Sequence, residues 1–305
     1  MVRVSVAVEG DKPLATYLAI ASQIDGRGFY SLQFYEHLPY RPAWGIALAV
    51  AHHVKGIKLG PVTVPAKLYS PVVNARLLAY LDSVSPGALL GISRGAYMSV
   101  NRASVQEVVD AVRQTVEEIR KIEWAGERNP VLYVGTSGPV LTRKASALPE
   151  VKGIVVDNLA NPVYAREMRR WMEESGGAGK ELVARPFTFI SERQEEVDRF
   201  IEELRRYVID LVDDSPMLRA AGLEPRDLDE PDDEAKALML ESFAVCGSVE
   251  EVLEKCVTLL RSGVSHLCFG HPISSNPVEG VKMIAEKVLP SLAELFNARS
   301  PATSF

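Results

Sequence analysis

The sequence has little cysteine, no long hydrophobic run and no excess of positive charge. Its three cysteines, Cys246, Cys256 and Cys268, include no C-x-x-C pair, so we interpret them as buried thiols and expect neither a disulfide framework nor a zinc site. No apolar stretch approaches the ~20 residues that span a bilayer, and the first residues lack the pattern of a signal peptide. The net charge of −6 argues against nucleic acid or an anionic membrane as a partner. We therefore expect a cytoplasmic protein that acts on a small molecule.

Several short catalytic motifs are missing as well. The chain contains no Walker loop, H-E-x-x-H helix, EF-hand loop or G-x-S-x-G elbow. Nucleotide hydrolysis, metal-dependent hydrolysis and serine chemistry are therefore without support, and we expect no metal site.

Short apolar strands alternate with amphipathic helices along most of the chain, a pattern typical of a parallel sheet covered by helices. The predicted strands are Val4–Val8, Ser31–Glu36, Ile57–Val64, Ala88–Ser93, Val131–Gly135, Gly153–Asp157, Leu182–Ile190 and His266–Gly270. The predicted helices are Pro13–Asp25, Pro42–His53, Pro71–Ser83, Ser104–Ile122, Gly138–Ala147, Pro162–Glu174, Glu192–Val212 and Ser248–Ser262.

Eight such repeats predict a closed barrel of the α/β class, a single (β/α)8 TIM barrel over residues 1–305. A chain of 305 residues with 47% hydrophobic content is large enough to form it as one domain. The alternative is a doubly wound open sheet. That fold usually carries a glycine-rich turn after its first strand, and here the turn reads Val8-Glu9-Gly10-Asp11-Lys12.

Two segments fall outside the repeat. Residues 213–241, placed between the seventh and eighth predicted helices, form an acidic insertion interrupted by proline. We consider two interpretations, a solvated connector and a lid over the barrel. Residues 277–297 predict an amphipathic helix that closes the barrel at its C-terminal end.

Barrel enzymes carry their reacting groups at the C-terminal ends of the strands, and the first two strand ends here bear titratable side chains. Glu9 follows the first strand and His37 follows the second. Each is either a functional acid or base at the barrel mouth or an ordinary rim residue. We expect Glu36 to pair or to cap a helix rather than to react.

The next strand ends favour anion binding. The fourth strand leads into Gly91-Ile92-Ser93-Arg94-Gly95, where glycine lets the backbone approach an oxyanion and the guanidinium matches phosphate oxygens. A plain turn with a surface arginine is the alternative. The fifth strand leads into Thr136-Ser137-Gly138 at a helix start, which is typical of a phosphate site and equally of an N-cap. Together these turns predict a rim site for a phosphorylated cofactor.

Four blocks of sequence resemble the luciferase-like flavin monooxygenases and their coenzyme F420-dependent relatives, which include methylenetetrahydromethanopterin reductase. They are Glu36-His37; Leu59-Gly60-Pro61-Val62-Thr63-Val64-Pro65 leading to Ser70-Pro71; Leu81-Asp82-Ser83-Val84-Ser85-Pro86-Gly87 running into Leu90-Gly91-Ile92-Ser93-Arg94-Gly95; and Phe243-Ala244-Val245-Cys246-Gly247-Ser248-Val249-Glu250-Glu251-Val252. The resemblance covers nearly the whole chain and is weaker from Leu148 to Glu241.

The resemblance implies a (β/α)8 barrel with a flavin-like ring across its mouth. It places a non-proline cis peptide at Val62-Thr63, behind the ring, where it bends the ring toward its reduced shape. It implies that Arg94 meets the cofactor phosphate together with the Thr136–Gly138 loop. His37 matches the active-site base of the luciferases, although F420-dependent members often keep other residues there.

We therefore expect an oxidoreductase that transfers a hydride between coenzyme F420 and a small molecule, with Glu9 and His37 as candidate catalytic residues. The expected cofactor-binding residues are Val62, Thr63, Gly91, Ser93, Arg94, Gly95, Thr136, Ser137 and Gly138. One alternative is an FMN-dependent monooxygenase supplied with reduced flavin by a separate reductase. Another is a flavin-binding relative without catalysis. The resemblance also implies a homodimer.

Overall fold

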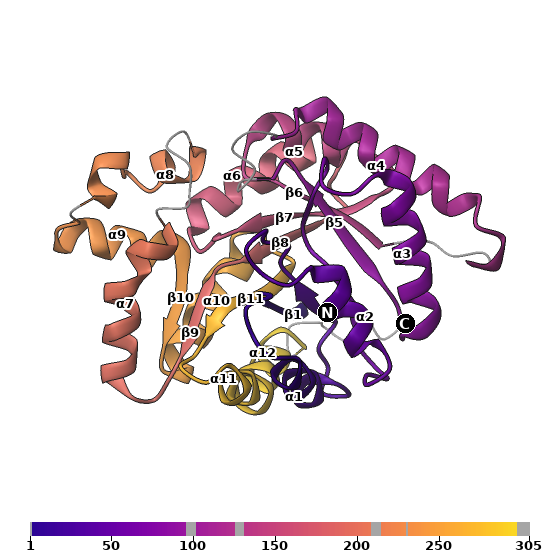
Figure 1. Ribbon diagram of the computed structural model, residues 1–305. Helices are drawn as coiled ribbons and strands as arrows, with labels where there is room; N and C mark the ends of the chain where they lie inside the picture. Colours follow the sequence, from indigo (N-terminus) through magenta and orange to yellow (C-terminus); the bar gives the residue numbers. More distant parts are fainter. Residues whose placement is uncertain (1, 96–101, 126–130, 209–214, 230, 298–305) are drawn as a thin grey trace, which may run out of the picture.

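Parallel strands from along the chain join into one sheet that curls into a barrel (Figure 1). The computed structural model describes residues 2–95, 102–125, 131–208, 215–229 and 231–297. The end of the predicted helix Glu192–Val212, the start of the acidic insertion and Glu230 lie outside the described residues.

The described strands are β1 (Arg3–Val8), β2 (Ser31–Phe34), β3 (Lys58–Pro61), β4 (Val64–Pro65), β5 (Leu89–Ser93), β6 (Val131–Gly135), β7 (Val151–Asp157), β8 (Glu181–Arg185), β9 (Phe187–Ile190), β10 (Ala244–Gly247) and β11 (His266–Ile273). The described α-helices are α1 (Leu14–Ile24), α2 (Ala43–Ala51), α3 (Pro71–Val84), α4 (Val105–Arg120), α5 (Pro139–Ser146), α6 (Pro162–Glu174), α7 (Gln194–Val208), α8 (Pro216–Ala220), α9 (Asp233–Phe243), α10 (Val249–Arg261), α11 (Pro277–Met283) and α12 (Leu289–Asn297).

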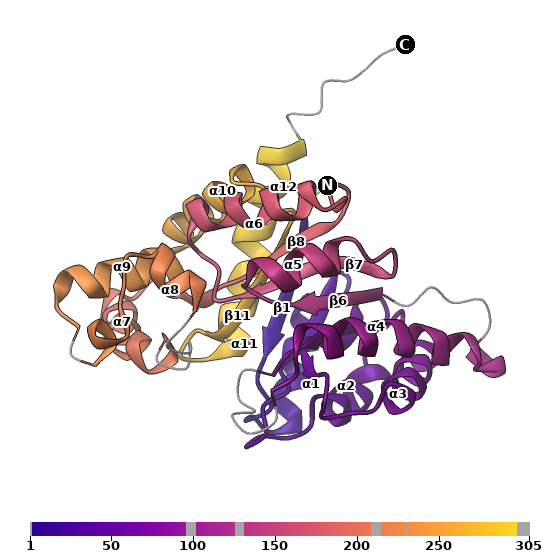
Figure 2. The same ribbon diagram turned by 90° about the horizontal axis from the view of Figure 1, so that it is seen from above.

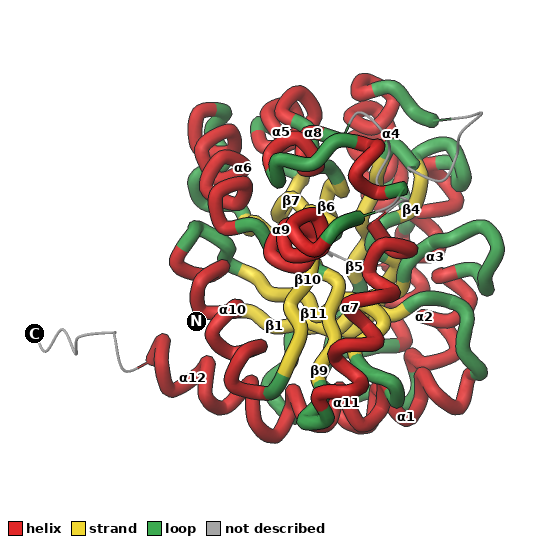
Figure 3. Tube along the Cα trace, turned by 90° about the vertical axis from the view of Figure 1, so that its left-hand side faces the viewer, coloured by secondary structure: helices red, strands yellow, loops and turns green. Residues whose placement is uncertain are grey.

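The strand order confirms the (β/α)8 fold class. The sheet runs β3-β2-β1-β11-β8-β7-β6-β5-β4. β3 and β4 are the two halves of the predicted third strand, and a bridge between Leu59 and Ala88 joins β3 to the β5 side, so the path closes on itself. If β3 with β4 and β8 with β9 each count as one strand and β10 is left out, the 11 described strands fill eight positions. Figure 3 shows helices surrounding the strands.

Two apolar clusters follow from the alternation of side chains along each strand. The smaller cluster contains no helix residue among its buried members, which are Ala7, Val62, Leu89, Tyr133, Val155, Val183 and Cys268. It is the interior of the barrel. The larger cluster adds the apolar faces of the helices and fills the layer between helices and strands.

The described residues of the predicted insertion lie between α7 and α10, which correspond to the seventh and eighth predicted helices. The predicted helix Glu192–Val212, observed as α7, does not cover the barrel wall between two strands. It packs its apolar stripe beside β9, where Phe200 stacks on Phe189 with ring centroids 4.8 Å apart. α7, α8 and α9 form a lobe at one end of the barrel (Figure 2), and α10 is the helix that leads back to β11.

The sequence analysis also missed β10. This strand of four residues follows α9 without a loop and pairs in parallel with β9. The predicted closing helix is present: α11 continues through a π-helical turn, Ile284–Val288, into α12.

Among the described residues, no helix combines the length and apolar character needed to cross a membrane. In the same residues, no group of three or more His, Cys, Asp or Glu side chains is arranged to hold a metal ion. Cys256 and Cys268 are buried and Cys246 is half-buried, all three as free thiols.

Candidate functional site

A cavity of about 440 Å³ lies at the C-terminal ends of the strands, a volume within the range of small-molecule sites. Loops from most of the barrel strands contribute to it, and the start of α8 adds Ser215, Pro216 and Met217. The insertion therefore forms part of the cavity wall, and Figure 3 shows α9 lying in front of the strands. The predicted site residues that line the cavity are Glu9, His37, Thr63, Ser93, Arg94, Gly95, Thr136, Ser137 and Gly138.

Glu9 stands between two histidines on one side of the cavity. Its Oε1 lies 3.8 Å from Nδ1 of His37 and 3.2 Å from Nε2 of His271. Burial lowers the pKa of His271 to about 3, so this imidazole is neutral at physiological pH. A neutral imidazole that meets a carboxylate through Nε2 donates its only N–H there. The arrangement can hold or pass a proton at the Glu9 carboxyl.

Glu36 also lines the cavity, but its hydrogen bonds belong to the fold. Its Oε2 accepts from the backbone N–H of Ala43 at 3.0 Å, at the N-terminus of α2, and from the hydroxyl of Tyr69 at 3.2 Å. Burial is the largest cause of its raised pKa. The interpretation of Glu36 as a capping residue is therefore confirmed, and α2 gains a partner at an end whose N-cap, Pro42, offers no side-chain acceptor.

The Val62-Thr63 peptide bond is cis, as the resemblance implied. Thr63 lines the cavity, whereas Val62 is fully buried beneath it, and the Val62 carbonyl accepts a hydrogen bond from Arg185. Gly91 lies below as well. A Cβ on Gly91 would stand 2.8 Å from Cγ1 of Val62 and 2.8 Å from Cγ2 of Thr63. The structure thus places Val62 and Gly91 as supports of the cavity floor rather than in its lining.

Two arginines line the opposite part of the cavity. Arg94 ends the turn after β5, and its Nε donates to the Ala103 carbonyl at 2.8 Å, which ties the guanidinium to the segment that precedes α4. Gly95 follows with a φ of 82°, the left-handed conformation that glycine adopts without strain. Arg102, which the sequence analysis missed, also lines the cavity. Two guanidinium groups beside one cavity favour a phosphate ligand.

The Thr136–Gly138 loop differs in detail from the expectation. The N-cap of α5 is Gly138, and no side chain caps this helix. Thr136 Oγ1 accepts from the Gly138 N–H at 3.1 Å, and the Thr136 N–H donates to the Val155 carbonyl at 3.0 Å. Two of the three amides therefore already have partners. Contacts from this loop to an anion would come from the hydroxyls and the first turn of α5.

Several cavity residues come from strand ends that the sequence analysis did not consider. Asp157 ends β7 and Asn158 follows it, Phe187 begins β9, and His271 lies in β11. The rule that found Glu9 and His37 applies equally to these strand ends. These cavity residues could have been predicted from the presence of a polar or charged residue at the C-terminal end of a predicted strand.

The chain is similar to known proteins along nearly its whole length. Residues 1–266 match the sequence model of the luciferase-like monooxygenases. The 5,10-methylenetetrahydromethanopterin reductase of Methanopyrus kandleri is 22% identical, over 96% of this chain and all of that protein.

Two solved structures share the fold. The coenzyme F420-dependent tetrahydromethanopterin reductase of Methanopyrus kandleri gives a TM-score of 0.76 at 20% identity, over 95% of this chain and 99% of that one. The oxygenating constituent of 3,6-diketocamphane monooxygenase from Pseudomonas putida, solved with FMN, gives 0.66 at 17% identity, over 95% and 98%.

Proposed function

We propose that this chain, which belongs to the luciferase-like monooxygenase family, is an oxidoreductase that binds coenzyme F420 and transfers a hydride between it and a small molecule. The reductase from Methanopyrus kandleri, similar along its whole length, supports a methylenetetrahydromethanopterin reductase-like reaction.

One observation carries the proposal: a single cavity joins two chemically different groups of side chains. Glu9 and His37 follow β1 and β2, and His271 lies in β11, which is adjacent to β1. Arg94 and the Thr136–Gly138 loop follow the adjacent strands β5 and β6, in a separate arc of the barrel. A ligand that carries a phosphate at one end and a reactive ring at the other fits such a division.

The residues present fit a phosphorylated deazaflavin. Arg94 and Arg102 would hold its phosphate through charge-assisted hydrogen bonds, and Thr63 lies where the chain can support a ring. When bound, the cofactor supplies the hydride chemistry. The chain would position the substrate beside it, exclude water with the start of α8, and hold a proton at the Glu9 carboxyl, oriented by His271.

FMN is the second candidate cofactor, because a solved structure with the same fold contains it. The chain would then be a monooxygenase that uses reduced flavin from a partner reductase. The arginines and the cavity do not discriminate between F420 and FMN, because both cofactors carry a phosphate and a tricyclic ring.

Titration of the protein with F420 and with FMN, followed by absorbance and fluorescence, tests the proposal. We expect saturable binding of F420 and only slow aerobic oxidation of the reduced complex. Preferential binding of FMN with rapid consumption of oxygen would support the monooxygenase instead. Tight binding without turnover with any tested substrate would support a non-catalytic relative, and binding of neither cofactor would refute the proposal.

We further propose that the protein works in the cytoplasm as a homodimer, without nucleic acid or membrane partners. Its acidic balance supports the absence of polyanionic partners. Size-exclusion chromatography with light scattering tests the dimer, for which we expect twice the chain mass of 33.4 kDa.

A further inference from the structure

Six polar side chains are buried inside the barrel, below the cavity. They are Ser5, Ser31, Gln33, Glu181, Arg185 and His266, and each is at most 6% exposed. Barrel interiors are usually filled by branched apolar residues, and a buried polar group is costly unless it is hydrogen-bonded. The six occupy alternate positions of β1, β2, β8 and β11, so they face one another across the interior.

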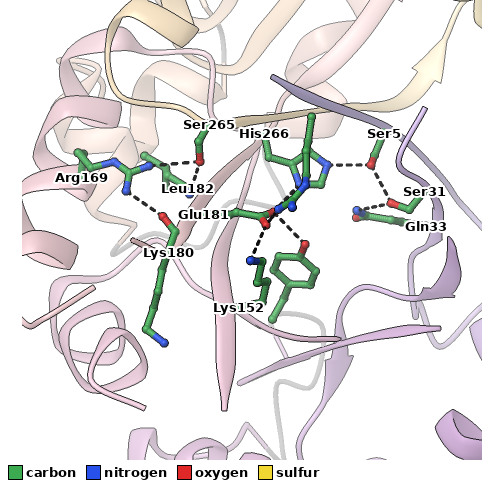
Figure 4. Close-up of polar contacts among 12 residues, drawn as sticks. Ser5, Ser31, Gln33, Lys152, Arg169, Lys180, Glu181, Leu182, Ser265 and His266 are labelled. Carbon is green, nitrogen blue, oxygen red and sulfur yellow. Dashed lines mark hydrogen bonds and ion pairs between the residues drawn. The ribbon is translucent and has the colours of Figure 1, made fainter. Parts of the chain in front are cut away.

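Glu181 forms the lower end of this group. Its carboxylate makes ion pairs with Arg3 and, at 3.7 Å, with Lys152, two residues that reach the surface. The Tyr133 hydroxyl donates to its Oε2 at 3.0 Å. Nδ1 of His266 lies 3.0 Å from the same oxygen. Figure 4 shows Lys152 and His266 approaching the carboxylate from different strands.

A continuous line of hydrogen bonds leads upward from His266, and Figure 4 shows its first links. His266 Nε2 lies 2.8 Å from the Ser5 hydroxyl, which lies 2.7 Å from the Ser31 hydroxyl. Gln33 donates to Ser31 at 3.2 Å, and the Gln33 carbonyl oxygen accepts from Nη1 of Arg185 at 3.5 Å, the longest link. We call these five residues with Glu181 the interior chain.

The interior chain has one consistent direction. Burial lowers the pKa of His266 to about 3, so the imidazole is neutral and has a single N–H. A carboxylate only accepts, so that N–H points from Nδ1 to Glu181 and Nε2 accepts from Ser5. Ser5 then accepts from Ser31, because the Ser5 proton is committed to His266. Every donor from Arg185 downward points toward Glu181, and such aligned hydrogen bonds strengthen one another.

At its upper end the interior chain meets the cavity floor through Arg185. This guanidinium is fully buried, donates from Nε to Asp157 at 2.5 Å, and donates from Nη1 to the Val62 carbonyl. Its central carbon lies 4.2 Å from the ring centroid of Tyr35. Asp157 and Tyr35 line the cavity, and Val62 directly precedes the cavity residue Thr63. Arg185 thus contacts three parts of the floor.

We propose that Gln33 and the rest of the interior chain are positioning groups for the site. They hold the Arg185 guanidinium in the orientation in which it supports Asp157 and the Val62 carbonyl from below. The inference depends on the proposed function only for the identity of the ligand above this floor.

Two variants interrupt the interior chain, and one variant serves as a control. Ser31→Ala removes the central hydroxyl, and Gln33→Met removes the amide at nearly constant side-chain volume. Ser262→Ala is the matched control. Ser262 is also buried, and its hydroxyl donates to the Leu259 carbonyl at 2.7 Å, but it is not part of the interior chain. Gln33→Glu keeps an acceptor for Arg185 but cannot donate to Ser31, so it separates the contact with Arg185 from the rest of the interior chain.

The first measurement needs no cofactor. Hydrogen exchange of the Arg185 Nε–H, followed by NMR and assigned with an Arg185→Lys variant, reports how firmly the guanidinium is held. We expect exchange about tenfold faster in Ser31→Ala and Gln33→Met, because each leaves a buried group unpaired. Ser262→Ala should remain within about twofold of the unaltered protein. Gln33→Glu, which keeps the contact with Arg185 but loses the link to Ser31, should show a smaller increase than Gln33→Met.

The second measurement is the dissociation constant for F420 and for FMN in the same variants. We expect about tenfold weaker binding for Ser31→Ala and Gln33→Met, which interrupt the interior chain, and no change for Ser262→Ala. If the unaltered protein binds neither cofactor, the proposed function fails while the exchange experiment still decides the positioning role. Equal exchange and equal affinity in all variants, with only thermal stability reduced, would overturn the inference.

Discussion

A methyl group added at Gly135 should push Thr63 out of place in the cavity wall. Gly135 ends β6 directly beside Thr63 and the β5 residue Ser93. In Gly135→Ala the new Cβ would lie 2.6 Å from Cγ2 of Thr63 and 3.2 Å from Oγ1 of the same side chain. Carbon atoms in good contact lie about 3.5–4.0 Å apart. Because both branches of Thr63 stand close to the new methyl group, rotating that side chain exchanges one clash for another.

This overlap should lower the free energy of unfolding. Overpacking by one carbon in a closely packed interior typically costs about 1–3 kcal/mol, and we expect that loss in the free energy of unfolding of Gly135→Ala. Relief by moving Thr63 toward the cavity would also reduce cofactor affinity. Gly138→Ala is the matched control. It lies three residues away in the same loop, has a φ of −94° and places its Cβ within 4 Å of nothing.

Urea denaturation measures the free energy of unfolding of Gly135→Ala and Gly138→Ala, and cofactor titration measures their affinity. Gly138→Ala should keep its free energy of unfolding within about 0.5 kcal/mol of the unaltered protein. Any loss of affinity there would come from the ligand side of the loop. Equal stability and equal affinity in Gly135→Ala and the unaltered protein would refute the packing argument around Thr63.

Three further predictions concern charged and titratable groups. Arg94→Ala should weaken cofactor binding by about 1.5–3 kcal/mol, because charge-assisted contacts to a phosphate are lost; an unchanged affinity in a calorimetric titration would contradict this role. Glu9→Gln should lower turnover while the cofactor dissociation constant changes little, since the amide cannot exchange a proton as the carboxyl does; full activity would exclude Glu9 as the proton-holding group. The pKa values of His266 and His271 are lowered to about 3 by burial, so below pH 6.5 the unfolded chain binds protons that the folded chain does not. The free energy of unfolding should therefore decrease as the pH falls from 6.5 toward 3, by up to about 1.4 kcal/mol per pH unit for each histidine. His266→Gln should reduce that slope in urea titrations between pH 7 and 4.5, and an identical slope would count against a neutral His266.

The barrel could be predicted because its signals are local. Period-two strands and period-3.6 helices repeat along the chain, and each predicted barrel strand has an observed counterpart. The packing of α7 with the lobe could not be predicted, because α7 has an amphipathic pattern like that of any barrel helix. Which surface its apolar stripe contacts depends on Phe189 and Phe200 stacking, a tertiary contact that no local pattern encodes.

The site was predicted unevenly for a related reason. Arg94, Thr136 and His37 stand at strand ends, where position along the chain gives position in the barrel. Nothing in the local sequence indicates that Arg185 contacts the site, because it lies within a predicted strand, Leu182–Ile190, that looks like any other. Its partners are 28 residues away at Asp157 and 152 residues away at Gln33. Such pairs become visible only when the register between strands is known.

The register also explains how one stripe of residues serves both the interior and the site. Inward positions of β2 run through Ser31 and Gln33, and the same alternation continues past the strand end to Tyr35 and His37, which line the cavity. On β1 the stripe that contains Ser5 reaches the cavity at Glu9. A slip of one residue in either strand would turn the whole stripe outward. The polar interior and the cavity therefore depend on the same strand pairing of β1 with β2, Ser5 opposite Ser31, and a substitution that disturbs this pairing should affect both at once.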